Sequence, residues 1–169
     1  MRLSKRIAAV ALAAVMAVSM LTACGGGGGN YGTRDSGKEA ALFDSVKSGR
    51  QVSAQVTAND PTLCETADRH LKEDLNTDLR IFGTQLVANV HVDGEEGKYL
   101  IITATANYVG GPLSELALEK IEKLAGKKLP GTDVNVHGKG SWVDVGVVVR
   151  NVGTQSYMAV AFKIANPNK

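Results

Sequence analysis

Hydrophobic and polar residues alternate along several stretches of the chain, as they do in β-strands that bury one face. The clearest case is residues 155–165, where Met158, Val160 and Phe162 occupy every second position. Turn residues at 93–97 separate two further alternating stretches, which we expect to pair as an antiparallel hairpin. In total, strands are predicted over residues 51–58, 83–92, 98–108, 132–136, 142–150 and 155–165.

Three other stretches repeat their hydrophobic residues every three or four positions, as one face of a helix does. Leu63, Ala67 and Leu71 belong to one such stripe, and Pro61 before them suits the first turn of a helix. Gly126 is placed to end the last of the three helices. Helices are therefore predicted over residues 38–48, 61–78 and 112–125.

The elements from residue 51 onward follow the order β-α-β-β-α-β, with further strand after it. This is the split order of ferredoxin-like sandwiches. We therefore expect an α+β fold, in which helices pack on one face of an antiparallel sheet and bury the hydrophobic rows of its strands. The pattern leaves open to which edge of the sheet the extra C-terminal strand adds.

The first residues have the layout of an export signal. Three basic residues precede the apolar run 7–18, which is too short and too rich in alanine for a typical membrane-spanning helix. The tetrapeptide Leu21-Thr22-Ala23-Cys24 follows. It resembles the lipobox of bacterial lipoproteins, and this resemblance covers residues 1–24 only.

The resemblance implies that the thiol of Cys24 receives a diacylglyceryl group and that the signal is cut between Ala23 and Cys24. Two acyl chains, such as palmitate, hold a protein on a membrane where a single chain lets it leave. We therefore expect the protein on the extracytoplasmic face of a bacterial cell membrane, attached by its lipid.

The chain divides into three predicted segments: a cleaved signal peptide (1–23), a glycine-rich flexible tether (24–37) and a single globular domain (38–169). A coil of the tether's length spans ~20 Å. The glycine run does not suit a phosphate-binding loop, because no strand precedes it and no Gly-Lys-Ser/Thr follows it.

Charge argues against a nucleic-acid partner. The chain has 19 Lys and Arg residues against 17 Asp and Glu residues. The predicted signal contains three of the basic residues and none of the acidic ones, which leaves 16 against 17, a net charge near −1. A general nucleic-acid-binding role therefore has no electrostatic support.

Candidate catalytic and metal-binding residues are sparse. His70, His91 and His137 lack the spacing of metal ligands, such as HxxxH, so no metal, cofactor or catalytic residue is predicted. Cys64 shares a helical stripe with Leu71, which favours burial as a small hydrophobic residue over a reactive thiol.

One side of the predicted sheet suits ligand binding. It combines aromatic, amide and hydroxyl side chains, which can hold a sugar or a peptide strand on a rigid surface. The alternative is an ordinary solvent-exposed sheet face, where Thr and Tyr are common. The candidate binding residues are Asn89, His91, Tyr99, Thr103, Thr105, Asn107, Trp142 and Tyr157.

These observations favour a membrane-anchored module without enzymatic activity, which binds a protein, peptide or glycan of the cell envelope. The alternative is a small hydrolase or transferase that acts on envelope material, with a site assembled from distant residues. His91 or His137 within hydrogen-bond reach of a carboxylate, in a pocket, would favour the alternative. A sheet without a concavity would favour the module.

Overall fold

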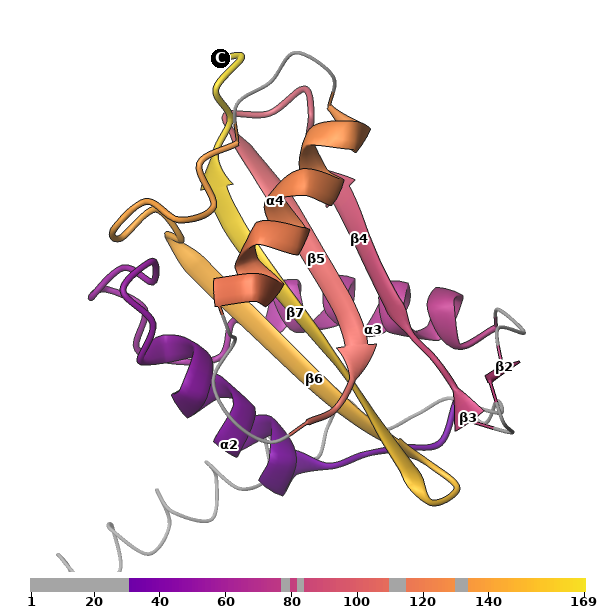
Figure 1. The fold of residues 1–169 in the computed structure, drawn as a ribbon. Helices are drawn as coiled ribbons and strands as arrows, with labels where there is room; N and C mark the ends of the chain where they lie inside the picture. The colour runs from indigo at the N-terminus through magenta and orange to yellow at the C-terminus, as the bar shows by residue number, and fades with distance from the viewer. Residues whose placement is uncertain (1–30, 77–79, 82–83, 110–114, 130–133) are drawn as a thin grey trace, which may run out of the picture.

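The computed structural model describes residues 31–76, 80–81, 84–109, 115–129 and 134–169, which form an α+β fold (Figure 1). A five-stranded antiparallel sheet has the order β1-β6-β7-β5-β4. Its strands are β1 (Thr33–Arg34), β4 (Ala88–Asp93), β5 (Tyr99–Asn107), β6 (Asp144–Val152) and β7 (Gln155–Ala165). The helices are α2 (Ser36–Lys47), α3 (Pro61–Leu75) and α4 (Glu115–Lys128), and a separate pair of short strands is β2 (Arg80–Ile81) and β3 (Thr84–Gln85). The predicted α+β class and antiparallel sheet are confirmed.

The central strand of the sheet is β7, which pairs along its length with β5 on one side and β6 on the other. A two-residue turn between Val152 and Gln155 joins β6 to β7. Gly153 in this turn has a φ of 61°, in the left-handed region that favours glycine. The strand predicted over residues 155–165 is therefore confirmed.

Two helices, α2 and α4, cover one face of the sheet (Figure 1). They pack on the rows that sequence alternation assigned to one side, such as Val145 and Val147 of β6 and Val160 of β7. At the end of this core the rings of Trp142 and Phe162 stack with centroids 3.7 Å apart. The buried indole of Trp142 also donates to a backbone carbonyl, 3.0 Å away. This face is a closed hydrophobic core.

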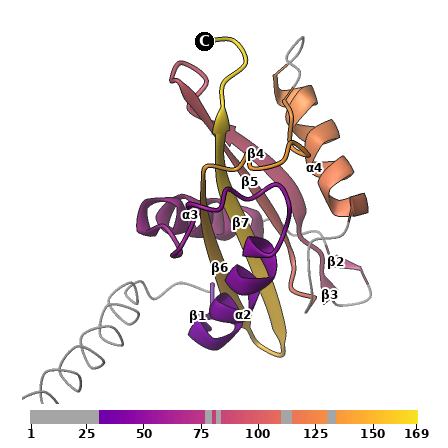
Figure 2. The same cartoon turned by 90° about the vertical axis from the view of Figure 1, so that its left-hand side faces the viewer.

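The third helix, α3, lies on the opposite face of the sheet (Figure 2). Its buried stripe of Leu63, Ala67 and Leu71 packs on small residues of the sheet, including Ala159 and Ala161. The prediction that all helices share one face is therefore wrong. Small side chains on the second face let a helix approach it closely, so this face is buried as well.

The predicted strand over residues 51–58 does not form. Val52 makes an isolated parallel bridge with Trp142, and the chain then turns, with the Val56 amide donating to the Ser53 carbonyl at 3.0 Å. Ala54 and Ala58, which the alternation placed beside the two valines, are exposed. Without this strand, and with the strand order observed, the ferredoxin-like arrangement is not confirmed.

Residues 31–37, assigned from the sequence to the tether, are part of the folded domain. Thr33 and Arg34 pair with β6 at the edge of the sheet. Asp35 caps α2, with its carboxylate accepting the Lys38 amide at 3.0 Å. The folded domain therefore includes these residues, while residues 1–30 lie outside the described part of the chain.

Other predicted boundaries shift by a few residues. Gly126 lies inside α4, which continues to Lys128, so it does not end the helix. Residues 134–136 form no strand, although Val134 and Val136 are buried in the core. The predicted elements also include residues 77–78, 83, 112–114 and 132–133, which lie outside the described residues.

Candidate functional site

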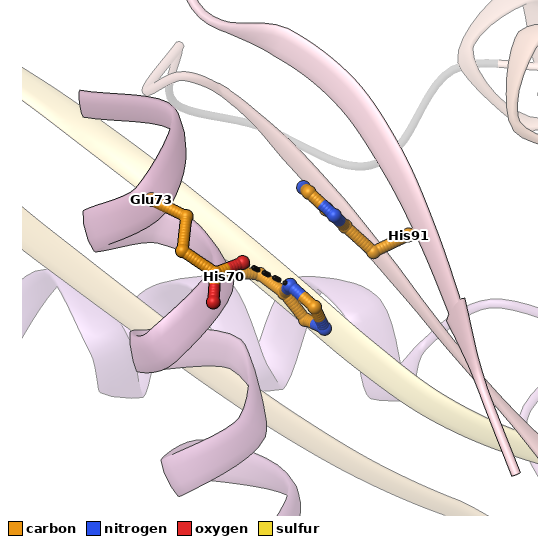
Figure 3. A group of neighbouring side chains, drawn as sticks. All are labelled: His70, Glu73 and His91. Carbon is orange, nitrogen blue, oxygen red and sulfur yellow. Dashed lines mark hydrogen bonds and ion pairs between the residues drawn. The ribbon is translucent and has the colours of Figure 1, made fainter. Parts of the chain in front are cut away.

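Two histidines from different elements meet where α3 crosses the sheet near its β4 edge. Figure 3 shows His70 and Glu73 on α3 and His91 on β4, with the two imidazoles directed toward each other. The rings stack with centroids 4.0 Å apart and an angle of 16° between their planes. Because α3 lies on the second face of the sheet, it brings His70 over the strand residue that points to that face.

The imidazole of His70 lies between two carboxylates. Its Nδ1 is 2.8 Å from Oε2 of Glu73, one turn further along α3, and its Nε2 is 2.7 Å from Oδ2 of Asp93 at the end of β4. Arg69 reaches both carboxylates, at 3.4 Å from Glu73 and 3.5 Å from Asp93. His70 is 5% exposed, so these contacts hold its buried imidazole in one orientation.

The imidazole of His91 is held by a third carboxylate, that of Asp74. Nε2 of His91 lies 2.9 Å from Oδ2 of Asp74. The same carboxylate accepts hydrogen bonds from Thr105 at 2.5 Å and from Asn89 at 2.9 Å. Asp74 is itself buried, so α3 and the two strands share a polar network inside the interface.

The network lowers the pKa of two of its carboxylates, Glu73 and Asp74. A hydrogen bond from His70 lowers the pKa of Glu73 below its usual range. Burial acts to raise the pKa of Asp74, but hydrogen bonds from His91, Thr105 and Asn89 outweigh it, and the pKa is lowered. Each ionised carboxylate therefore stabilises the folded state above its unfolded-state pKa, and this contribution is lost as the pH falls through the folded-state pKa.

Sequence reasoning did not predict this cluster. It tested the histidines against one-segment metal spacings, whereas His70 and His91 come from a helix and a strand. The available signal was the His70-x-x-Glu73 spacing, which places two side chains on one face of a helix. Three residues, His70, Glu73 and His91, each offer one ligand atom within 4.8 Å of the others.

The structure does not bring the eight predicted binding residues onto one open surface. Thr103, Thr105 and Tyr157 are buried beneath α3, and Trp142 lies in the core on the other face. The remaining four are Asn89 and His91 beside Asp74, Asn107 bonded to the backbone of Gln85 and Val87, and Tyr99, which is 38% exposed. Ligand binding by the accessible members of this set stays a prediction. The predicted cleavage and lipidation residues, Ala23 and Cys24, lie outside the described residues.

The third histidine, His137, pairs with a different carboxylate. Its Nε2 lies 2.9 Å from Oε2 of Glu122 on α4. Neither of two cavities, a cleft of about 390 Å³ along α3 and an apolar cavity of about 170 Å³ beneath α4, is lined by His91 or His137. Each of His91 and His137 therefore lies within hydrogen-bond reach of a carboxylate, which is one of the two features expected of an enzyme. The other feature, a pocket at the histidine, is not provided by these two cavities.

Cys64 is buried against β6, as the helical stripe predicted. Its Sγ lies 3.5 Å from the carbonyl oxygen of Val147, and burial raises the pKa of the thiol from 9.0 to about 11. The fraction of reactive thiolate at neutral pH is therefore about 100-fold below that of an unperturbed thiol.

We expect Cys64 to react at least about 100-fold more slowly with a maleimide in the native chain than in urea. The measurement is a labelling time course followed by mass spectrometry, with a Cys24→Ala background so that one thiol remains. Equal rates in the native and unfolded chain would show that the thiol is accessible.

No helix within the described residues is long and apolar enough to cross a membrane. Comparison with known proteins found no match to this chain among family models, curated protein sequences or solved structures.

Proposed function

We propose that the protein is a lipid-anchored module of the extracytoplasmic membrane face, which binds a partner in the cell envelope and has no enzymatic activity. The observation that carries the proposal is the sequence Leu21-Thr22-Ala23-Cys24 after a basic and then apolar N-terminal stretch. A lipobox cysteine supplies a membrane anchor without any membrane-binding surface on the domain.

The described domain is compatible with this role. The first described residues are bonded to its body: the carbonyl oxygens of Tyr31 and Gly32 accept hydrogen bonds from Arg150 at 3.4 Å and 3.0 Å. The polypeptide is thus attached to the body of the domain shortly after Cys24. Helices cover both faces of the sheet, so the surface open to a partner consists of helix exteriors, loops and the sheet edge (Figure 2).

One observation favours the alternative of a small hydrolase or transferase. His91 lies 2.9 Å from Asp74, and a histidine oriented by a carboxylate is a common general base. Cys64 does not suit the role of a thiol nucleophile for this histidine, because burial raises the pKa of its thiol to about 11. We therefore keep the binding module as the proposal.

Anchoring is tested by replacing Cys24 with alanine. We expect Cys24→Ala either to be released from the membrane fraction or to keep its signal peptide uncleaved, because alanine has no thiol to form the thioether. The measurement combines membrane fractionation, mass spectrometry of the N-terminus and the fluorescence of Trp142, the chain's single tryptophan, as a check on folding.

The matched control is Cys64→Ala, which should remain processed and membrane-bound because this thiol lies inside the domain. A processed Cys24→Ala chain that stays in the membrane would contradict lipid anchoring. Partner binding is tested separately by cross-linking on intact cells. The binding proposal predicts a discrete adduct of the anchored chain that is absent with Cys24→Ala, and the absence of any such adduct would contradict it.

A further inference from the structure

We propose that His70, Glu73 and His91 bind a divalent transition-metal ion of the zinc class. One nitrogen of each imidazole and one carboxylate oxygen already lie within 4.8 Å of one another. The proposal concerns the folded domain and does not depend on lipid attachment at Cys24, so either one can fail without the other.

The ligand types suit such an ion. Imidazole nitrogen and carboxylate oxygen are ordinary zinc ligands, and two histidines with one glutamate form a three-ligand set that leaves a fourth position open. His70 and Glu73 are three residues apart on α3, so one helix face presents both. His91 supplies the third ligand from β4, across the interface between the helix and the sheet.

A carboxylate supports each imidazole at the nitrogen that would face away from the ion. Asp93 lies 2.7 Å from Nε2 of His70, and Asp74 lies 2.9 Å from Nε2 of His91. This leaves Nδ1 of His70 beside Glu73, at 2.8 Å, while Nδ1 of His91 has no hydrogen-bond partner among the described residues. A carboxylate on the outer nitrogen is the usual support of a metal-binding histidine, because it fixes the tautomer and the ring orientation.

Coordination requires a small rearrangement of these side chains. Tetrahedral ligands at zinc distances lie roughly 3.3 Å apart, whereas the three ligand atoms here lie within 4.8 Å of one another. The ring of His91 must also tilt out of its stack on His70 so that the in-plane lone pairs of the two imidazoles converge. Glu73, whose side chain is 52% exposed, has room for the larger movement, while His91, at 18%, has to tilt about its contact with Asp74. His70, which is 5% exposed, remains the fixed ligand of the set.

The charges of the cluster also favour a dication. Glu73, Asp74 and Asp93 contribute three negative charges, and Arg69 beside two of them contributes one positive charge. With neutral imidazoles, as ligation requires, the net charge is −2. A divalent ion therefore neutralises the cluster without the unfavourable burial of further charge.

A buried hydroxyl beside His91 is a second feature that suits a ligand here. Thr103 pairs with His91 across β4 and β5, and its side chain is on the same face. It is fully buried, and its hydroxyl has no hydrogen-bond partner among the described residues. A water in the open coordination position would be a partner of suitable chemistry for this hydroxyl.

The test uses the full chain with Cys24→Ser, purified in detergent, so that the thiol at position 24 adds no ligand. Zn²⁺ affinity is measured by competition with a chromophoric chelator, and Co²⁺ is added as a spectroscopic probe of the ligand geometry. We expect one ion per chain and visible Co²⁺ absorption bands of a low-coordinate nitrogen and oxygen site.

Four single substitutions distinguish this site from weak surface binding. Glu73→Gln and His91→Gln each remove a ligand and should weaken Zn²⁺ binding by more than about 100-fold. This loss is larger than the one expected for removing a carboxylate that only supports a ligand. Asp93→Asn removes a supporting carboxylate and should weaken it by about 10- to 100-fold. His137→Gln, at the histidine that pairs with Glu122, is the control and should leave the affinity unchanged.

A measurement of the unfolding temperature with and without Zn²⁺ distinguishes a variant that has lost a ligand from one that binds weakly because it folds poorly. Zn²⁺ should raise the unfolding temperature of the Cys24→Ser chain and of His137→Gln, but not that of Glu73→Gln, whose side chain is half exposed. The proposal is overturned if the chain binds Zn²⁺ no more tightly than the Glu73→Gln/His91→Gln double variant. It is equally overturned if His137→Gln loses affinity as much as His91→Gln does.

Discussion

Replacing Gly146 with alanine is expected to lower the free energy of unfolding by about 3 kcal/mol, at the upper end of the usual cost of overpacking. Gly146 lies on β6, directly beneath the first turn of α3. A Cβ at this position would be 2.5 Å from the backbone carbon of Leu63 and 2.5 Å from the amide nitrogen of Cys64. Backbone atoms cannot move aside as a flexible side chain can, so α3 itself must shift from the sheet.

The measurement is urea unfolding followed by the fluorescence of Trp142, which is fully buried in the native core. Gly126→Ala is the matched control, because a Cβ there meets no atom within 4 Å and the residue lies inside α4. Alanine within a helix should raise the free energy of unfolding by up to about 1 kcal/mol. If Gly146→Ala were as stable as the wild type, the close contact of α3 with β6 would be refuted.

Replacing Arg150 with methionine is expected to lower the free energy of unfolding by about 3 kcal/mol, the usual cost of removing one partner of a buried ion pair. Arg150 and Asp68 form a two-bond pair between β6 and α3, at 2.5 Å and 3.0 Å. The arginine side chain is 7% exposed and that of Asp68 15%. Methionine fills similar space but removes the two-bond partner of the carboxylate inside the interface and leaves it the ion pair with Lys72, at 2.8 Å.

Lys163→Met is the matched control, because Lys163 pairs with Asp144 at 3.6 Å on a surface where both side chains are about one third exposed. Such a pair contributes about 1 kcal/mol or less, so this variant should differ little from the wild type. Equal losses in the two methionine variants would mean that the Arg150 pair adds nothing beyond a surface contact.

The loss in Arg150→Met should also depend on pH. Burial acts to raise the pKa of Asp68, but hydrogen bonds from Arg150 and Lys72 outweigh it, so the folded-state pKa is below its usual value. The ionised pair therefore stabilises the fold above the unfolded-state pKa of Asp68, and this contribution is lost as the pH falls through the lowered one. The difference between the variant and the wild type should be largest near neutral pH and shrink in acid.

Alternation along the chain predicted the inward rows of β5, β6 and β7 correctly, but it did not predict what covers the other face of the sheet. Val145, Val147 and Val149 form one buried row of β6, as expected. On the other side of the sheet the row contains small residues, including Gly146, Ala159 and Ala161. The polar residues of this side predicted a binding face or an ordinary solvent-exposed face, yet its small side chains allow α3 to pack closely against it.

The error about the second face also explains why the histidine cluster was not predicted. Had α3 been placed on that face, His70 and the strand residue His91 would have been expected near one another. In the one-face arrangement a covering helix lies on the side away from His91. The predicted strand over residues 51–58 failed for a related reason, because a short alternation cannot show whether a partner strand lies beside it.

The sequence by itself determined the α+β class, the inward rows of the main strands, the approximate bounds of α2 and α3 along the chain and the burial of Cys64. These properties depend on residue periods within one segment, which a single helix or strand imposes on its own side chains. Only the tertiary structure decided that α3 covers the second face and that His70, Glu73 and His91 meet there. Such contacts depend on how closely backbones far apart in the chain approach each other, and residues such as Gly146 control that distance without leaving a local pattern.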